Sequence, residues 1–315
     1  MRIVTARALV TGASGFIGAH LVRHLRRRGW RVAVLARPGS RTDCLEHADA
    51  PVAVHRYDGT SASVCQALEA ERPDVVLHLA SCFLVNHRPE DLDALVDGNI
   101  RFGLHLADAM VRTGCARLVA AGTSWQHWND ADYRPVNLYA ATKQACDALF
   151  AYYRDAGSLR LATLALFDTY GPGDTRRKII PLLQEALRTG KPLDLSPGAQ
   201  RLDFLHVEDA AAAFRHAAEG LLAEGADALA PGEYAIRSGT RVSLRELAAL
   251  IESVVGRPLP VHWGVHPYRP REVMEPWTRG NSLPGWRPAI GLREGLETVF
   301  CPGALSAGRV PGAHA

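Results

Sequence analysis

Short apolar runs alternate with longer amphipathic segments along the first half of the chain. The apolar runs predict strands at residues 8–10, 32–35, 52–55, 75–79, 118–121 and 161–164. The segments between most of them are long enough for helices, which we expect at 16–28, 61–71, 90–112 and 138–154. Alternation on this scale is typical of α/β proteins, in which helices cover both faces of a parallel sheet.

The regular alternation ends near residue 165. Glycine and proline then interrupt the chain, as in Gly171-Pro172-Gly173, Pro197-Gly198 and a proline-rich stretch from 258 to 288. This pattern predicts a smaller C-terminal α/β domain with loops and short elements. We expect residues 1–165, with returns near 203–236, to form the first domain. Residues 166–302 would mainly form the second, and residues 303–315 a disordered tail.

Composition narrows the class of protein. The 315 residues are 47% hydrophobic and 22% charged, and the net charge of +3 is spread along the chain. This profile is typical of a soluble globular protein and argues against a nucleic-acid partner. No apolar run approaches the roughly 20 residues that span a membrane, and Met1 stands too close to the first glycine loop for a signal peptide. The six cysteines and 13 histidines show no metal-ligand spacing. We therefore expect no metal, buried thiols and a cytoplasmic location.

The first apolar run leads into Thr11-Gly-Ala-Ser-Gly-Phe-Ile-Gly18. Three glycines at this spacing, between a strand and a helix, are typical of a dinucleotide site in a doubly wound Rossmann domain. Gly12 permits the tight turn, Gly15 lets the backbone approach a pyrophosphate, and Gly18 lets the helix pack close to the strand. The helix N-terminus would add N–H groups for the phosphates. The same expected site includes Ser14, Phe16 and Ile17.

The residues after the second predicted strand bear on the choice of cofactor. An NAD site would offer Asp or Glu here to the ribose 2′-hydroxyl, but the chain reads Leu35-Ala-Arg37-Pro-Gly-Ser-Arg41. Arg37 and Arg41 suit a 2′-phosphate by charge and hydrogen bonding, so we predict NADP(H) over NAD(H). Further cofactor contacts are expected from residues after the third and fourth strands, namely Asp58, Gly59, Leu79, Ala80 and Ser81.

Asn99 lies inside a predicted helix, where asparagine is a mild misfit. It either bonds the backbone of a neighbouring strand, as part of the cofactor site, or is merely exposed. The sequence leaves the two interpretations equally open.

The fifth predicted strand ends in Thr123-Ser124, and Tyr139 and Lys143 follow at the start of a helix. Residues four positions apart share one helix face, so the Lys143 ammonium can lie beside the Tyr139 phenol. A free phenol has a pKa of about 10. The charges of Lys143 and of an oxidised nicotinamide would both favour the phenolate and so make Tyr139 a useful acid or base. Thr123, or the adjacent Ser124, would hold the substrate oxygen.

With these features the chain resembles the extended short-chain dehydrogenase/reductase superfamily, in its NAD-dependent epimerase/dehydratase group. The resemblance covers nearly the whole chain and continues in Leu166-Phe-Asp-Thr-Tyr-Gly-Pro172, Arg201-Leu-Asp-Phe-Leu-His-Val-Glu-Asp209 and Gly285-Trp-Arg-Pro288. It implies that Thr123, rather than Ser124, is catalytic with Tyr139 and Lys143, and that the last two also contact the cofactor. It further implies cofactor contacts from Leu166 and Thr169, and substrate contacts from Phe83, Asp168, Lys178, Arg201 and Arg271. Asp168 departs from the asparagine that is usual in this family.

Within the family, the strings Gly122-Thr-Ser-Trp-Gln-His-Trp128 and Pro135-Val-Asn-Leu-Tyr139-Ala-Ala-Thr-Lys143 most resemble nucleotide-sugar 4-ketoreductases of the CDP-abequose synthase group. Ser124 and Trp125 stand where 4,6-dehydratases carry an Asp-Glu pair, which argues against a dehydratase. The resemblance implies NADPH-dependent reduction of the C4 ketone of a dTDP- or CDP-linked 4-keto-6-deoxyhexose. It also implies a homodimer built from the helices near 90–112 and 138–154. The alternatives are a nucleotide-sugar epimerase with retained NAD(H), and a non-catalytic regulator that binds NADP(H).

Overall fold

The computed structural model describes residues 5–42, 45, 51–157 and 159–301, which form two compact units. The first unit contains the described residues up to Phe167, together with 210–236 and 277–287. The second contains 168–209, 237–276 and the described residues from 288 onward. Cys44 and the expected tail at 303–315 lie outside the described residues.

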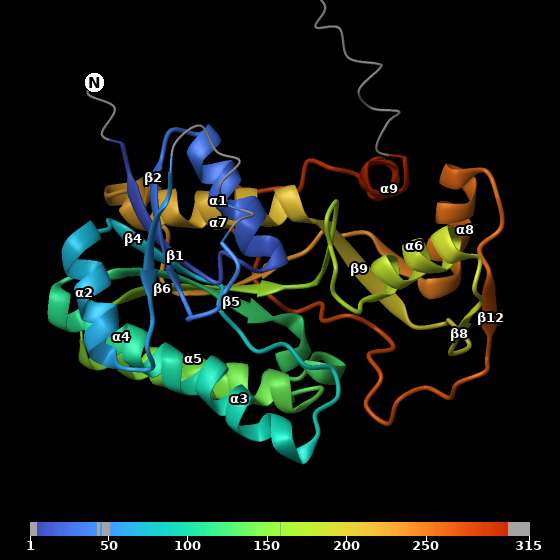
Figure 1. The fold of residues 1–315 in the computed structure, drawn as a ribbon, viewed down its shortest axis with the longest axis horizontal. Coiled ribbons are helices and arrows are strands. Elements are labelled where there is room, and N and C mark those ends of the chain that lie inside the picture. The colour runs from blue at the N-terminus through green and yellow to red at the C-terminus, as the bar shows by residue number, and fades with distance from the viewer. Residues whose placement is uncertain (1–4, 43–44, 46–50, 158, 302–315) are drawn as a thin grey trace, which may run out of the picture. The chain divides into compact units, whose positions relative to one another are not determined.

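A parallel sheet of seven strands forms the centre of the first unit (Figure 1). Its strands are β1 (Arg7–Thr11), β2 (Arg31–Ala36), β3 (Ala53–Arg56), β4 (Val75–His78), β5 (Arg117–Thr123), β6 (Arg160–Leu166) and β10 (Gly232–Ile236). Their order is β10-β6-β5-β4-β1-β2-β3, and every pairing is parallel. The order reverses between β1 and β4, where Thr11 pairs with His78. The predicted doubly wound Rossmann fold is therefore confirmed, and the carboxyl ends of β1 and β4 mark its expected binding crevice.

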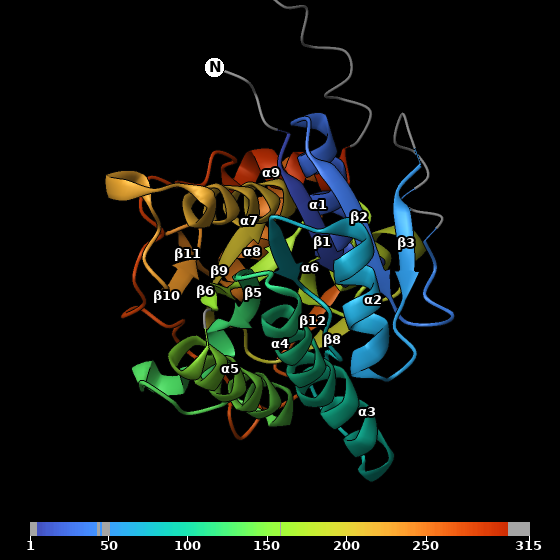
Figure 2. The ribbon, with the colours of Figure 1, turned by 90° about the vertical axis from the view of Figure 1, so that its left-hand side faces the viewer.

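Helices cover both faces of this sheet (Figures 1 and 2). On one face lie α1 (Phe16–Arg27) and α7 (Val207–Leu222), and on the other lie α2 (Ser61–Glu71), α4 (Phe102–Thr113) and α5 (Leu138–Ala156). Both faces are buried, so the central strands are almost wholly apolar. One continuous core joins the sheet to the second set of helices through Leu9, Val76, Leu106, Leu118 and Phe150.

The helix expected at 90–112 is built from several pieces. A 3₁₀ turn (Pro89–Asp91) precedes α3 (Leu92–Val96), and a π-helical turn (Asp97–Arg101) joins α3 to α4. Such turns insert one extra residue and often occur at functional sites. Asn99 stands within the π-helical turn.

The second unit contains two small sheets. Strands β7 (Asp168–Tyr170), β9 (Arg201–His206) and β11 (Arg241–Ser243) form one, in the order β11-β9-β7, and β8 (Leu193–Leu195) pairs with β12 (Val261–Trp263). Helices α6 (Ile179–Thr189), α8 (Leu244–Val255) and α9 (Leu292–Phe300) belong to the same unit. Its own core includes Leu183, Phe204, Leu247, Ile251 and Leu296.

The return to the first unit differs from the sequence expectation of 203–236. It begins at Ala210 because the preceding strand β9 pairs with β7 and β11 instead. Residues 277–287, which the sequence does not assign to the first domain, also belong to it. They are held there by a backbone bond from Ala235 N to Asn281 O of 2.8 Å and by the Trp277 ring stacked near Phe167.

The cysteines differ partly from expectation. Cys65, Cys115 and Cys146 are buried, but Cys82 and Cys301 are half-buried. Across the described residues, no three or more His, Cys, Asp or Glu side chains are grouped so that they could hold a metal ion. None of the helices in that part of the chain is long and apolar enough to cross a membrane.

Candidate active site

The glycine loop joins β1 to α1 and packs backbone against backbone with the segment after β4. Gly12 has φ +73°, and a Cβ at this position would stand 2.5 Å from Ala80 N, so no larger residue fits. A Cβ on Gly18 would collide with the Gly12 carbonyl, which explains how α1 approaches the strand so closely. The loop thus has the form that the sequence predicts for a dinucleotide site.

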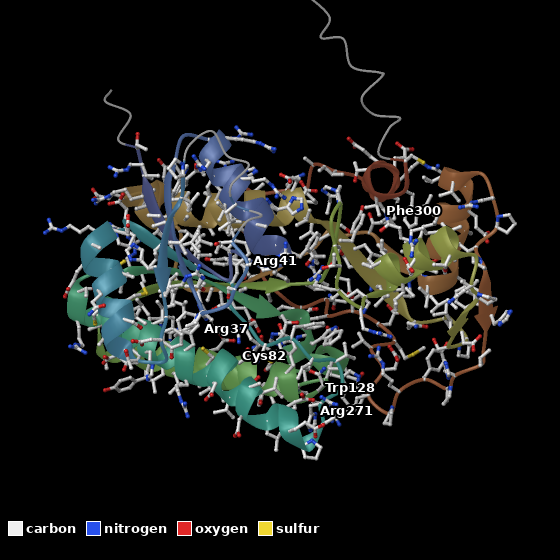
Figure 3. The ribbon with its side chains drawn as sticks, viewed as in Figure 1. Arg37, Arg41, Cys82, Trp128, Arg271 and Phe300 are labelled. Carbon is white, nitrogen blue, oxygen red and sulfur yellow. The ribbon has the colours of Figure 1, made fainter. Side chains whose placement is uncertain are left out.

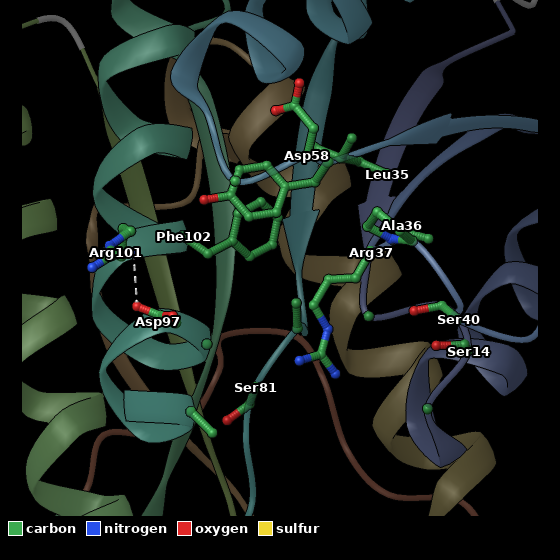
Figure 4. Close-up of a pocket in the computed structure, with 18 of the residues that line it drawn as sticks. Ser14, Leu35, Ala36, Arg37, Ser40, Asp58, Ser81, Asp97, Arg101 and Phe102 are labelled. Atoms are coloured by element: carbon green, nitrogen blue, oxygen red, sulfur yellow. Dashed lines mark ion pairs between the residues drawn. The ribbon is translucent and has the colours of Figure 1, made fainter. Parts of the chain in front are cut away.

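A pocket of about 780 Å³ lies at the carboxyl ends of the strands beside this loop (Figure 4). Its volume is within the usual range for cofactor sites. Nine residues that the sequence places at the cofactor line it, namely Gly12, Ser14, Gly15, Arg37, Asp58, Gly59, Leu79, Ala80 and Ser81. The sequence does not single out the other lining residues, which are Leu35, Ala36, Pro38, Ser40, Tyr57, Glu90, Asp93, Ala94, Asp97, Gly98, Arg101 and Phe102.

Arg37 reaches into this pocket from the end of β2 (Figure 4). Ser14 and Ser40 lie on one side of its guanidinium, and Asp97 and Arg101 lie on the other. Asp97 pairs with Arg101 at 3.0 Å, so Arg37 is not the partner of that carboxylate in this arrangement. Arg41 is not among the residues that line the pocket. Figure 3 labels both Arg37 and Arg41.

Asp58 is fixed at the turn before α2. Its Oδ1 accepts hydrogen bonds from Thr60 Oγ1 at 2.6 Å and Thr60 N at 2.9 Å. These bonds, with that of Ser63, hold the pKa of Asp58 below its ordinary value, so the group is a carboxylate at neutral pH. A fixed acceptor at the pocket wall suits the cofactor contact that the sequence predicts for Asp58.

Asn99 is 1% exposed, so the buried interpretation applies. Its Oδ1 accepts from Ser81 Oγ at 2.9 Å and Cys82 N at 2.7 Å, and its Nδ2 donates to Cys82 O at 3.1 Å and Thr142 Oγ1 at 2.9 Å. Protein groups therefore use its full hydrogen-bonding capacity. Asn99 does not line the pocket itself but holds Ser81, which does.

Thr123 and Ser124 stand at the end of β5, where a 3₁₀ turn (Ser124–Gln126) begins. Thr123 is 8% exposed, and Ser124 is half-buried. Thr123 Oγ1 accepts a bond from Trp125 N at 3.3 Å, and Thr123 N donates to Gln126 Oε1 at 3.0 Å. Both hydroxyls are thus at the strand end that the sequence predicts.

Tyr139 and Lys143 lie in the first turns of α5. Tyr139 is half-buried, and the Phe83 ring meets it edge-on with centroids 5.0 Å apart, while Lys143 is only 2% exposed. Asn137, which sequence reasoning missed, starts the helix. Its Oδ1 accepts from Ala140 N at 3.0 Å, and its Nδ2 donates to Val85 O at 2.9 Å. An Asn before a periodic segment is a known helix-start signal, so this role is detectable from sequence.

The segment between Thr123 and Tyr139 is anchored within the first unit. The His127 ring stacks on Trp277 with centroids 3.8 Å apart and lies 3.1 Å from a Glu233 oxygen. Burial alone would lower the pKa of His127, but the hydrogen bond and charge of Glu233 outweigh it and raise that pKa. Asp130 accepts from Thr278 N at 2.6 Å.

The remaining predicted cofactor residues do not line the pocket. Phe16 and Ile17 form the first turn of α1, and Leu166 is buried at the end of β6. Thr169 is buried in β7 of the second unit.

Four predicted substrate residues belong to the second unit. Lys178 stands at the start of α6 and pairs with Asp168 at 3.2 Å, so an anion at Lys178 would compete with that carboxylate. Arg201 donates to Arg241 O at 2.7 Å. Arg271 is exposed.

Known proteins resemble this chain over most of its length. Residues 8–227 match the family model for the NAD dependent epimerase/dehydratase family. CDP-abequose synthase of Salmonella typhimurium is 25% identical over 305 residues, which are 95% of this chain and 99% of that protein. dTDP-glucose 4,6-dehydratase of Streptomyces griseus is 29% identical over 94% of this chain and 93% of its own length.

A solved structure extends the resemblance to the fold. The UDP-glucose 4-epimerase of Thermus thermophilus, in complex with NAD, matches with a TM-score of 0.78 and 26% identity over 95% of this chain and 99% of that one. The family match covers well over half of the 315 residues, and the glycine loop and Tyr139–Lys143 pair lie inside it. The chain therefore belongs to the NAD dependent epimerase/dehydratase family.

Proposed function

We propose that the protein reduces the C4 ketone of a 4-keto-6-deoxyhexose linked to dTDP or CDP, with NADPH as reductant, in deoxysugar biosynthesis. One observation carries this proposal: Thr123, Tyr139 and Lys143 share a compact unit with the dinucleotide pocket, while Ser124 and Trp125 follow the strand instead of two acids. Ketone reduction needs a proton donor and a hydride donor, but no acid and base pair for elimination.

The residues around the pocket fit a phosphorylated dinucleotide. Gly12 and Gly18 let the loop pack tightly against backbone, since a Cβ at either position would collide with backbone atoms, and a pocket of about 780 Å³ adjoins the loop. When bound, the cofactor would supply the hydride. Arg37, with Ser40 beside it on the pocket wall, would hold a 2′-phosphate by a charge-assisted hydrogen bond, which supports NADP(H) over NAD(H).

The protein's own groups would handle the proton and the substrate oxygen. Tyr139 would give its phenolic proton to the ketone oxygen as the new alcohol forms. Lys143 is buried on the same helix and would stabilise the phenolate left behind. Thr123 Oγ1 accepts from Trp125 N, which leaves its hydroxyl hydrogen to be donated to the substrate oxygen.

A Tyr139→Phe variant tests this assignment. Its turnover with NADPH and the keto-sugar nucleotide should fall by about a hundredfold or more, because the proton donor is gone. Its NADPH affinity, measured by fluorescence titration, should stay near that of the wild type. Unchanged turnover would remove Tyr139 from the mechanism.

Two alanine variants separate the neighbouring hydroxyls. Thr123→Ala should lose most of its turnover, because its hydroxyl orients the substrate oxygen, whereas Ser124→Ala should keep it. The opposite result would move the catalytic role to Ser124.

The nucleotide sugar and the assembly belong to the same proposal. Lys178, Arg201 and Arg271 would hold the diphosphate, and Phe83 would line the substrate side of Tyr139.

A homodimer would form through α3, α4 and α5, where Leu92, Val96 and Tyr152 are 44%, 43% and 64% exposed. Sedimentation velocity should give twice the chain mass, and a monomer would contradict this part. Unpaired cysteines among the described residues suit a reducing cytoplasm.

A further inference from the structure

The carboxylate of Asp147 lies on α5, one helical turn after Lys143. Asp147 follows Lys143 by four positions on α5, so both side chains share one helix face. Asp147 Oδ2 accepts a hydrogen bond of 2.8 Å from Gln126 Nε2. The Gln126 side chain is 1% exposed, and its Oε1 accepts from Thr123 N. One carboxylate is thus connected to the strand end that carries Thr123 and to the helix that carries Lys143.

Asp147 has few hydrogen-bond partners for a charged group. Its Oδ1 has neither solvent contact nor a hydrogen-bond partner in the described part of the chain. Burial raises the pKa of Asp147 to about 6, although the Lys143 charge and the Gln126 bond oppose that rise. Glu233 on β10 raises this pKa further, and His127 lowers it. Asp147 is half-buried as a residue, but a carboxylate oxygen kept out of water without a partner needs a compensating role.

Lys143, in turn, needs a negative charge nearby. It is 2% exposed and forms no direct ion pair among the residues that the structure describes. An ammonium out of water is stable only near a compensating negative charge. The interaction between Lys143 and Asp147 is electrostatic rather than a contact pair, since Lys143 acts on the pKa of Asp147 by its charge.

We propose that Asp147 is a positioning residue for the reaction: its carboxylate is the counter-charge of the Lys143 ammonium, and through Gln126 it fixes the Thr123 backbone. This inference rests on the proposed function, because it assumes that Tyr139, Lys143 and Thr123 carry the chemistry. Asp147 itself does not line the pocket.

A consequence is that turnover depends on the ionisation of Asp147. As the pH falls through about 6, Asp147 takes up a proton, Lys143 loses its counter-charge and Gln126 loses a charged acceptor. Turnover should therefore have an acid limb near that pH.

The test compares three variants by the pH dependence of turnover. Asp147→Asn keeps the size but removes the charge, so turnover near pH 7.5 should fall by about tenfold to a hundredfold. The acid limb near pH 6 should disappear as well. NADPH affinity should change by less than about threefold, since the site lies outside the pocket. Asp147→Glu should restore part of the turnover and an acid limb.

Gln144→Ala is the matched control. Gln144 Oε1 accepts from the same Gln126 Nε2 at 2.8 Å but carries no charge, so its loss should leave the acid limb in place. If Asp147→Asn keeps wild-type turnover and the same acid limb, the proposal is overturned. Loss of the limb in Gln144→Ala as well would also overturn it, because charge would then not be the cause.

A second measurement needs no turnover and so separates this inference from the proposed function. The Asp147 carboxyl can be titrated by ¹³C NMR in the wild type and in Lys143→Met, which removes the ammonium but keeps a long side chain. The pKa of Asp147 should rise in Lys143→Met, because the charge of Lys143 lowers this pKa in the wild type. An unchanged pKa would refute the coupling, whereas absent NADPH consumption by the wild type would refute only the proposed function.

Discussion

Asn99→Leu is the change that tests most sharply how the cofactor pocket is held. Leucine has the same branched shape as asparagine, so the change removes four hydrogen bonds without leaving a cavity. The bonds join the π-helical turn to Ser81 and Cys82 after β4 and to Thr142 on α5. The variant therefore isolates the polar connection from the packing.

The expected magnitude follows from which groups are left without a partner. The Cys82 N–H and C=O lose their bonds at a half-buried position, and an unsatisfied buried group costs about 1 to 3 kcal/mol. Ser81 is exposed and can turn to water, and Thr142 Oγ1 keeps its bond of 2.8 Å to Tyr139 O. Two groups at the lower half of that range give a loss of about 2 to 4 kcal/mol.

Thermal unfolding followed by circular dichroism measures this loss. For a unit of this size the melting temperature should fall by about 4 to 16 °C. The control is Gln66→Leu, an exposed amide on α2 replaced by the same residue. A melting temperature of Asn99→Leu equal to that of this control would refute the reasoning that these bonds hold the segment after β4.

Three further predictions concern the pocket and the sheet. Arg37→Ala should weaken NADP(H) binding by about tenfold, as expected for one exposed charge-assisted bond, and leave NAD(H) unaffected in calorimetry; equal losses would contradict the 2′-phosphate assignment. Gly12→Ala should abolish cofactor binding, because the new Cβ would meet the backbone after β4, whereas Gly39→Ala, with a similar φ of +76° and open space around it, should not. Asp74→Asn should lower the urea midpoint at pH 7, because its bonds to Arg7 hold the pKa of Asp74 below the ordinary value. That stabilisation is present above the unfolded-state pKa and lost as the pH falls through the lower folded-state value, so the difference between the two proteins should begin to shrink as the pH falls below about 4; a constant difference would contradict it.

The strands and helices of the first unit are predictable from the local pattern of apolar and polar residues. Each predicted strand and helix has a counterpart because buried parallel strands and amphipathic helices leave strong periodic signals. The glycine loop is equally clear, since the steric demand at Gly12 and Gly18 admits no other residue. The position of Arg37 in the pocket follows from its place after β2.

Features that depend on distant contacts are not readable from the sequence. Residues 277–287 join the first unit through a bond to Ala235 and the stacking of Trp277, and no local pattern predicts either. The sequence analysis expects the chain to return to the first unit from about residue 203, whereas the return begins at Ala210. The difference arises because β9 looks like any other strand until its partners are known. The π-helical turn at Asn99 escapes sequence reasoning in the same way, since the misfit residue is satisfied by groups far away in the chain.

Stoichiometry of NADPH oxidation tests the central claim most directly. The purified protein is mixed with a dTDP- or CDP-linked 4-keto-6-deoxyhexose, and the loss of NADPH absorbance is compared with the sugar alcohol formed. The account predicts one NADPH oxidised for each ketone reduced, with the reaction abolished in Tyr139→Phe. Interconversion of 4-hydroxyl epimers of a nucleotide sugar, with no net loss of NADPH, would contradict it and identify an epimerase.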